Sequence, residues 1–165
     1  MILYHGSNVK VTKINLKKCR PFKDFGLGFY VTAISKQAHL MARRVARMYG
    51  GSPIVSKFKL DSKIYDEQTL RLLSFDKPSQ EWALFVINNR DRNFADMSNL
   101  LSNRDNKYDM VFGPVANDDL TYLFRIFRSR LIDSDALLGR LEYKTLTNQY
   151  SFHTLQVLAY LKPEV

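Results

Sequence analysis

Several features are scarce in this sequence of 165 residues, and each scarcity excludes a class of protein. Cys19 is the only cysteine, so no disulfide forms within the chain, and no Cys or His spacing indicates a zinc site. Seven glycines and five prolines exclude collagen-like and low-complexity chains. No apolar run approaches the ~18 residues that span a bilayer, and the N-terminus lacks a signal-peptide pattern. We therefore expect a soluble, cytoplasmic protein without membrane contact.

Acidic residues are scarce in the N-terminal third of the chain. Residues 1–60 contain 12 Lys or Arg and one acid, Asp24, whereas the whole chain has a net charge of +9. A field of one sign attracts polyanions, so nucleic acid, a dinucleotide or an acidic protein is a candidate ligand. The alternative is a surface that only keeps the protein soluble. The basic residues that stand out in a loop and a helix are Lys17, Lys18, Arg20, Arg43, Arg44 and Arg47.

What the sequence does contain is typical of one globular domain covering residues 1–165, with 45% apolar and 13% aromatic residues. Short apolar runs bounded by turn residues predict strands, and longer runs with helical spacing predict helices. We expect strands at 2–4, 29–32, 54–60, 70–75, 108–112 and 149–153, and helices at 35–49, 78–89, 117–132 and 135–146, with a short helix or strand at 155–161. Because strands and helices do not alternate strictly, the expected class is α+β.

The first candidate motif is His5-Gly6-Ser7, which follows the first apolar strand and predicts a turn there. A glycine next to a histidine leaves room for a flat ligand to approach the backbone, whose N–H and C=O can pair with an amide. The alternative is a histidine with a purely structural role.

The second motif runs from Asp24 to Thr32 and places Phe29 and Tyr30 directly after the Gly26-Leu27-Gly28 turn. Beside a cleft, a strand tyrosine offers a stacking surface for a planar ring, although β-propensity alone also explains it. The motif is not a dinucleotide fingerprint, because no third glycine opens a helix.

The third motif is 148–153, where polar and aromatic residues alternate. In a strand, this spacing puts Gln149, Ser151 and His153 on one face. The alternative is a solvated sheet face without a ligand.

Together these motifs resemble the ADP-ribosyltransferase superfamily, in the branch of diphtheria toxin and the poly(ADP-ribose) polymerases, which has a His-Tyr-Glu triad. Phe25-Gly26-Leu27-Gly28-Phe29-Tyr30 followed by Ser35-Lys36-Gln37-Ala38 is close to the polymerase pattern. The sequence is still more similar to a bacterial family of small, toxin-like proteins of unassigned function in that superfamily. The segments that carry this similarity are Leu3–Ser7, Asp24–Tyr30, Glu81-Trp82, Asn89-Arg90, Gly113–Asp118 and Gln149–Thr154.

The resemblance implies a split antiparallel β-sheet core flanked by helices, and transfer of ADP-ribose from NAD without a metal. It also implies a bacterial toxin of a toxin–antitoxin or phage-defence system, with an antitoxin protein as partner. Its target is expected to be nucleic acid, or else protein. Two alternatives stay open: an inactive fold that binds nucleic acid or a partner, and an NAD glycohydrolase that transfers ADP-ribose to water.

The resemblance also assigns roles to residues. His5 would hold the adenine-side ribose, the Gly6 backbone the carboxamide, and Tyr30 would stack on the nicotinamide, with Ser7 or Thr32 shaping the pocket. Gln149 would orient the ribose of the nicotinamide. Gly28 and Phe29 complete the residues expected at the cofactor, and the basic loop, Lys17, Lys18 and Arg20, with Arg43 and Arg47, would contact phosphates.

Gln149 departs from the family pattern, which has a glutamate there. An amide can orient a hydroxyl but carries no charge and takes no proton, so transfer of a single ADP-ribose is expected rather than polymer synthesis. Asp118 or Asp119 is a candidate replacement carboxylate, with helix capping as the alternative. Glu81 is expected to stabilise a helix start, and His153 is a candidate substrate contact or a structural residue.

Overall fold

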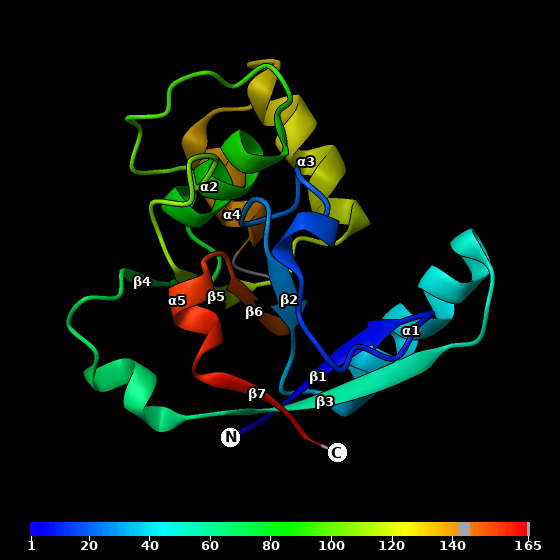
Figure 1. The fold of residues 1–165 in the computed structure, drawn as a ribbon. Coiled ribbons are helices and arrows are strands. Elements are labelled where there is room, and N and C mark those ends of the chain that lie inside the picture. Colours follow the sequence, from blue (N-terminus) through cyan, green and yellow to red (C-terminus); the bar gives the residue numbers. More distant parts are fainter. Residues whose placement is uncertain (142–145, 165) are drawn as a thin grey trace.

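The computed structural model describes residues 1–141 and 146–164, without the side chain of Asp118. Strands, helices and two 3-10 turns follow one another without strict alternation, as an α+β fold requires (Figure 1). The strands are β1 (Ile2–Ser7), β2 (Phe29–Val31), β3 (Ile54–Leu60), β4 (Leu72–Ser74), β5 (Met110–Pro114), β6 (Asn148–Phe152) and β7 (Leu161–Glu164). The helices are α1 (Ser35–Tyr49), α2 (Gln80–Arg90), α3 (Asp118–Arg128), α4 (Ser134–Leu141) and α5 (Leu155–Leu158), and the 3-10 turns are η1 (Leu16–Lys18) and η2 (Ser62–Asp66).

The strands form two sheets. One has the order β1-β3-β7 and the other β2-β6-β5-β4. All pairings are antiparallel except that of β4 with β5, which is parallel. Within the residues that the structure describes, one isolated bridge, between Tyr4 and Thr32, joins the sheets. The fold is therefore a split sheet flanked by helices, as predicted, with one parallel pair that was not.

Two apolar clusters lie on opposite faces of the four-stranded sheet. The first lies between the two sheets, where Leu3, Phe58, Val31 and Phe152 are buried. The second lies between the four-stranded sheet and the layer of α2, α3 and α4, and includes the fully buried Trp82 (Figure 1). Because side chains alternate along a strand, β2 and β5 contribute residues to both clusters.

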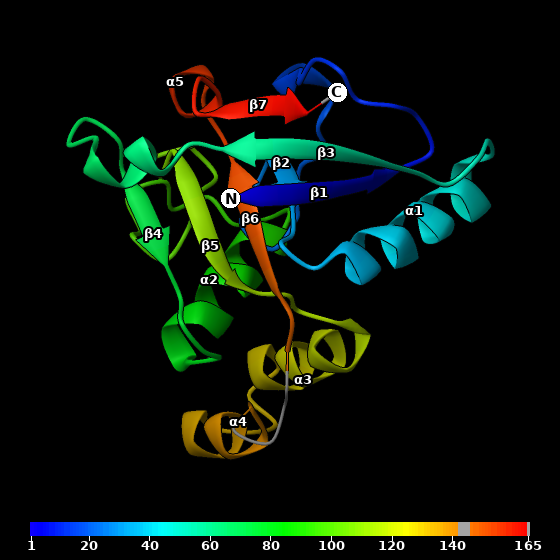
Figure 2. The ribbon, with the colours of Figure 1, turned by 90° about the horizontal axis from the view of Figure 1, so that it is seen from below.

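Helix α1 packs outside this stack, against β1 and β3, and extends away from the α2–α4 layer (Figure 2). Ala38 and Ala42 are its buried residues. A Cβ on Gly6 would lie 2.0 Å from the Ala38 carbonyl oxygen and 2.8 Å from the Ala42 nitrogen. The glycine thus permits the close approach of α1 to β1 on the side of the strand where a Cβ would stand.

Helix starts follow the capping residues in the sequence. Ser79 and Asn117 accept hydrogen bonds from the main-chain N–H groups of Trp82 and Leu120, as N-caps do. Ser35, in contrast, is the first residue of α1 and not its N-cap. At the other end of α1, Gly50 has a φ of +80°, a conformation that glycine adopts readily.

Two further predictions need correction. His5-Gly6-Ser7 is not a turn, because β1 continues through Ser7 and pairs with Ser56, Val55 and Ile54. Residues 155–161 do not form one element: α5 comes first and β7 follows. The end of the helix expected at 135–146 lies partly outside the described residues.

No helix in the described part of the chain is long and apolar enough to cross a membrane.

Candidate functional site

The candidate site lies where β1 and β2 meet and then separate. Tyr4 and Thr32 exchange both main-chain hydrogen bonds, at 2.8 and 3.0 Å, and the pairing stops there. The next pair would be Gly6 with Tyr30, but the His5 side chain takes the Tyr30 carbonyl instead, with Nδ1 at 2.7 Å. Because hydrogen-bonding edges alternate along a strand, the Gly6 N–H and C=O point toward β2, not toward β3.

His5 is held as a neutral, oriented imidazole. Burial lowers its pKa, and the hydrogen bond to the Tyr30 carbonyl opposes that change. A carbonyl oxygen only accepts, so Nδ1 carries the proton and donates it to Tyr30. Nε2 is then the ring's acceptor, which suits a hydroxyl donor such as a sugar. The ring packs on Phe29, with centroids 4.4 Å apart.

The Tyr30 side chain is fixed by its own turn. Its hydroxyl donates to the Gly26 carbonyl at 2.7 Å and accepts the Phe25 N–H at 3.0 Å. Burial, and secondarily the charge of Asp24, raise the pKa of this phenol well above its usual value, so it stays protonated. The half-buried ring is thereby presented in one orientation, next to Phe25 on one side.

Gln149 lies on the same face of the four-stranded sheet as Tyr30. Tyr30 pairs with Ser151 across β2 and β6, and Gln149 is two residues along β6, so the two side chains are diagonal neighbours. The Gln149 amide nitrogen donates to Asp24 Oδ2 at 2.8 Å. This bond fixes the amide orientation and leaves Oε1 as an acceptor. The prediction of a shared face for Gln149 and Ser151 is confirmed.

Asp24 is the carboxylate that the structure brings to Gln149. It is 8% exposed and binds four groups from three distant segments. Arg90 donates Nη2 and Nε to Oδ1 at 2.6 and 3.0 Å, and the Ala116 N–H donates to Oδ2 at 3.0 Å, beside Gln149. Because the Arg90 guanidinium balances its charge, the pair orients Gln149 without adding net charge to the site.

Sequence reasoning gave Asp24 and Arg90 no role, although both stand in the motifs that carry the resemblance. One signal was available. Asp24 is the only acid among the first 60 residues, in a strongly basic segment. Its partner could not be predicted, because Arg90 is 66 residues away in the chain.

Residues 1–162 match the family described as "Protein of unknown function (DUF3990)". The chain belongs to the DUF3990 family. No curated protein and no solved structure matches it. The DUF3990 match covers every residue of the site described above, so the site lies within the family's domain.

Three of the residues expected at the cofactor or substrate lie in the interior of this DUF3990 protein. His153 is 2% exposed, its Nδ1 donates to the Leu27 carbonyl, and its Nε2 lies 2.8 Å from the Ser151 hydroxyl. No ring nitrogen is left for a substrate. Phe29 is 5% exposed and packs on Phe58. At Gly28, a Cβ would lie 2.6 Å from His153 Nδ1, so packing requires this glycine.

Thr32 and Ser7 lie near the junction of the two sheets. Thr32 is buried, and its hydroxyl accepts the Ile34 N–H and lies 3.1 Å from the Asn148 carbonyl. It therefore joins β2 to β6 and to the start of α1. Ser7 is half-buried at the end of β1.

The replacement carboxylates expected from the sequence lie at helix starts. Asp118 is the first residue of α3, and its side chain lies outside the described part of the structure. Asp119 is exposed in the same turn. Glu81 is exposed in the first turn of α2, where its own N–H and the Ser79 hydroxyl lower its pKa, as expected for a helix start.

The basic residues expected to contact phosphates lie on the surface. Arg20 bonds the Tyr49 hydroxyl and stacks over that ring at 4.1 Å, so the loop with Lys17 and Lys18 meets the end of α1. Arg43, Arg44 and Arg47 are exposed along α1. Among the residues that the structure describes, no group of three His, Cys, Asp or Glu is placed to hold a metal ion.

Proposed function

We propose that this DUF3990 protein is an NAD-dependent mono-ADP-ribosyltransferase. The observation that carries the proposal is the contact of His5 with the Tyr30 main chain, beside the split between two sheets, together with the neighbouring side chains of Tyr30 and Gln149 on one sheet face. Each of the three is oriented by a hydrogen bond and retains a group that suits one part of NAD. An inactive binding protein and an NAD glycohydrolase are the alternatives that the test below separates.

The residues present fit a dinucleotide of this chemistry. The fixed, half-buried Tyr30 ring offers a stacking surface for nicotinamide, and the Gly6 N–H and C=O face β2, where an amide can pair with them. His5 Nε2 accepts from a ribose hydroxyl. Gln149 Oε1 accepts from a hydroxyl of the other ribose, as a glutamate oxygen would.

NAD supplies the bond that breaks, which joins nicotinamide nitrogen to ribose carbon. Nicotinamide leaves with the electron pair, the nucleophile of the target bonds to that carbon, and its proton is released. Charge develops on the ribose in the transition state, so fixed dipoles assist most. Asp24 and Arg90 hold Gln149 in place for this step. They add no net charge, which favours a single transfer to a reactive target over chain elongation.

The setting we propose is a bacterial toxin of a toxin–antitoxin or phage-defence system, acting in the cytoplasm and held in check by an antitoxin protein. The similarity to small toxin-like bacterial proteins supports this setting. Nucleic acid is the target we favour over protein, because the basic loop and α1 carry exposed positive charge at their contact through Arg20 and Tyr49.

The test is transfer of label from NAD labelled in its adenylate group. The purified protein is incubated with bacterial lysate, and protein, DNA and RNA fractions are counted separately. We expect label in the nucleic-acid fraction, and a loss of at least tenfold in Gln149→Ala and in Tyr30→Ala. Gln149→Glu replaces the donor to Asp24 Oδ2 with a second carboxylate, so it is expected to lose the orienting hydrogen bond and to transfer less label than the original protein.

The matched control is Gln156→Ala, which removes an amide from an exposed site on α5, where it bonds Thr69. It is expected to transfer label like the original protein. Intact NAD with no labelled fraction would contradict the proposal and favour a binding protein. Free ADP-ribose without labelled macromolecule would identify a glycohydrolase, and label in protein alone would exclude the nucleic-acid target.

A further inference from the structure

We infer that the pocket between α2 and α3 binds single-stranded nucleic acid, through phosphates at its arginines and a base on its apolar floor. This pocket lies outside the site described above, and none of its residues was expected to bind a ligand from the sequence. Its use for the acceptor strand rests on the proposed function, but binding itself does not.

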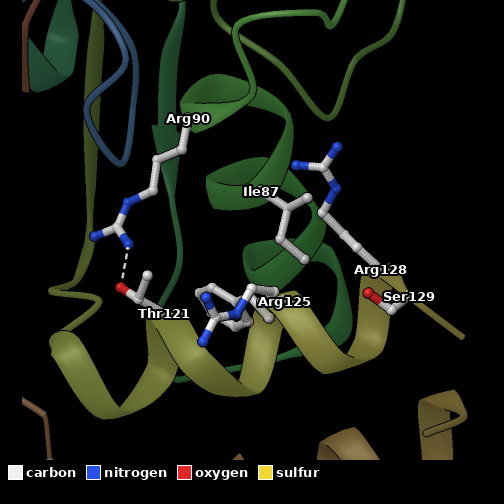
Figure 3. A pocket seen from close by; sticks show the side chains of 7 residues that line it. Ile87, Arg90, Thr121, Arg125, Arg128 and Ser129 are labelled. Atoms are coloured by element: carbon white, nitrogen blue, oxygen red, sulfur yellow. Dashed lines mark hydrogen bonds between the residues drawn. The ribbon is translucent and has the colours of Figure 1, made fainter. Parts of the chain in front are cut away.

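The pocket has a polar rim and an apolar floor. Its volume is about 380 Å³, and its floor contains the buried side chains of Ile87 and Phe124. Figure 3 shows the guanidinium groups of Arg90 and Arg125 on the Thr121 side, and that of Arg128 at the opposite end. Guanidinium groups at both ends of an apolar floor match a nucleotide unit, in which phosphates flank a flat base, and that of Arg125 is the one without a carboxylate partner among the described residues.

Arg125 is the pocket arginine that is not paired with a described carboxylate, whereas Arg90 is paired with Asp24 and Arg128 with Asp91. Arg90 Nη1 donates to the Thr121 hydroxyl at 2.7 Å. Its Nη2 donates to Asp24 Oδ1 and to the Ala116 carbonyl, so the guanidinium is held in one position. Arg125 is exposed and contacts the Tyr122 ring, and it forms no ion pair with any described carboxylate. A phosphate at this end therefore meets the guanidinium of Arg125, which has no competing carboxylate among the described residues, beside the charge-balanced Arg90–Asp24 pair.

Further arginines and aromatic rings continue the surface beyond the pocket. Arg128 pairs with the Asp91 carboxylate at 2.7 Å, and the Asp91 carbonyl accepts from Arg104. Arg104 and Arg92 lie over the Phe22 ring, at 4.8 and 5.2 Å. At the other end, Tyr122 is 58% exposed. Cationic grooves with aromatic side chains for stacking are typical of sites for single-stranded nucleic acid, whose bases are free to stack.

Phe22 adds an independent observation. Its φ is +60°, a left-handed conformation that is uncommon for a bulky residue and marks local strain. The half-buried ring is kept there between the loop and two arginines. The ring and the two guanidinium groups thus form a cationic and aromatic surface next to Asp91, the partner of Arg128.

The Asp24 carboxylate connects the pocket to the proposed transfer site. Arg90 binds Asp24 Oδ1 and lines the pocket, while Gln149 binds Asp24 Oδ2. A strand whose phosphate lies on Arg90 and Arg125 is thus guided toward the Gln149 side of the sheet. Under the proposed function, this geometry assigns the pocket to the acceptor and not to NAD.

The test is binding of a fluorescein-labelled 12-nucleotide RNA or DNA strand to the whole protein, followed by anisotropy without NAD at several salt concentrations. Tyr122 does not line the pocket, but its exposed ring contacts Arg125 and offers a stacking surface for a neighbouring base, so we expect Tyr122→Ala to weaken binding about tenfold. We expect Arg125→Gln to weaken it several-fold and to lower the salt slope by about one. Arg140→Gln makes the same charge change at an exposed residue of α4, and its affinity for the strand is expected to stay within about twofold of that of the original protein.

Two results would overturn the inference. One is wild-type binding by both Tyr122→Ala and Arg125→Gln, and the other is equal displacement of the strand by poly-glutamate, which indicates an acidic protein instead. Circular dichroism of each variant shows whether it is folded before its affinity is interpreted. Since NAD is absent, a failure of label transfer leaves this result unaffected, and the reverse also holds.

Discussion

At the scale of single residues, Asp24 determines how the site is arranged. Its carboxylate binds Arg90, the Ala116 N–H and the Gln149 amide, while its neighbour Phe25 binds the Tyr30 hydroxyl. The side chains of Asp24 and Arg90 are 11% and 27% exposed. Removal of one partner from an ion pair with so little contact with water is strongly destabilising, because the other partner is left as a buried, unpaired charge.

Asp24→Asn is therefore expected to be strongly destabilising. The neutral amide cannot balance the charge of Arg90. Its NH2 group would also take the place of one carboxylate oxygen and point a donor at the N–H groups that this oxygen accepts from. We expect a loss of roughly 3–5 kcal/mol in the free energy of unfolding, measured with urea. In an Arg90→Gln background the same change is expected to cost much less.

The matched control for this prediction is Asp105→Asn. Asp105 and Lys107 lie 3.7 Å apart, and the Asp105 side chain is 37% exposed. Loss of such a surface pair is expected to cost less than about 1 kcal/mol. Equal losses for the two aspartates would show that Asp24 is not the organising residue described here.

At the scale of elements, the contact of α1 with β1 depends on one glycine. A Cβ at Gly6 meets the main chain of α1, which cannot move aside as a flexible side chain would. We expect Gly6→Ala to destabilise the protein by roughly 3 kcal/mol, the upper end of overpacking costs, and to displace α1 from the sheet. Thermal unfolding measures the first effect, and hydrogen exchange along α1 measures the second.

Gly139 in α4 offers the comparison. Nothing lies within 4 Å of a Cβ placed there, so Gly139→Ala is expected to stabilise the protein by roughly 0.5–1 kcal/mol. If Gly6→Ala destabilised the protein no more than Gly139→Ala does, the close approach of α1 to β1 described here would be contradicted.

Elements with local signals were the ones predicted best. The helix at 35–49 and the strand at 54–60 have the expected bounds, because periodicity and flanking glycines define them locally. The extension of β1 through Ser7 depends on pairing with β3, about 50 residues later, and the parallel pairing of β4 with β5 depends on the whole sheet. The same limit applied to the site: Tyr30 and Gln149 were predicted from motifs, whereas Asp24–Arg90 depends on distant contacts.

At the scale of the whole molecule, acid is expected to weaken the fold through His153. Burial lowers the pKa of this ring from 6.5 to about 4. Between these values the unfolded chain binds a proton that the folded protein does not, so stability rises with pH across this window and is lost as pH falls through it. The full effect is about 3 kcal/mol, of which about 2 kcal/mol is lost between pH 7 and pH 5.

Urea unfolding at pH 7 and pH 5 measures this loss. His153→Gln is expected to be less stable at pH 7 but to lose about 2 kcal/mol less on acidification. His39→Gln changes an exposed histidine on α1 and is expected to keep the pH dependence of the original protein. Parallel pH curves for His153→Gln and the original protein would show that the ring does not titrate as described.

The Asp24 cluster also has a consequence for the order in which the protein is made. Its contacts close loops of 66, 92 and 125 residues, so the Asp24 cluster is incomplete until Gln149 has been synthesised. At about 5–20 residues per second, the ribosome needs roughly 6–25 s for that interval. During this time the nascent chain displays β1, β2 and α1 without the completed site. An inhibitor that recognises this N-terminal segment would therefore encounter the protein before it is able to act.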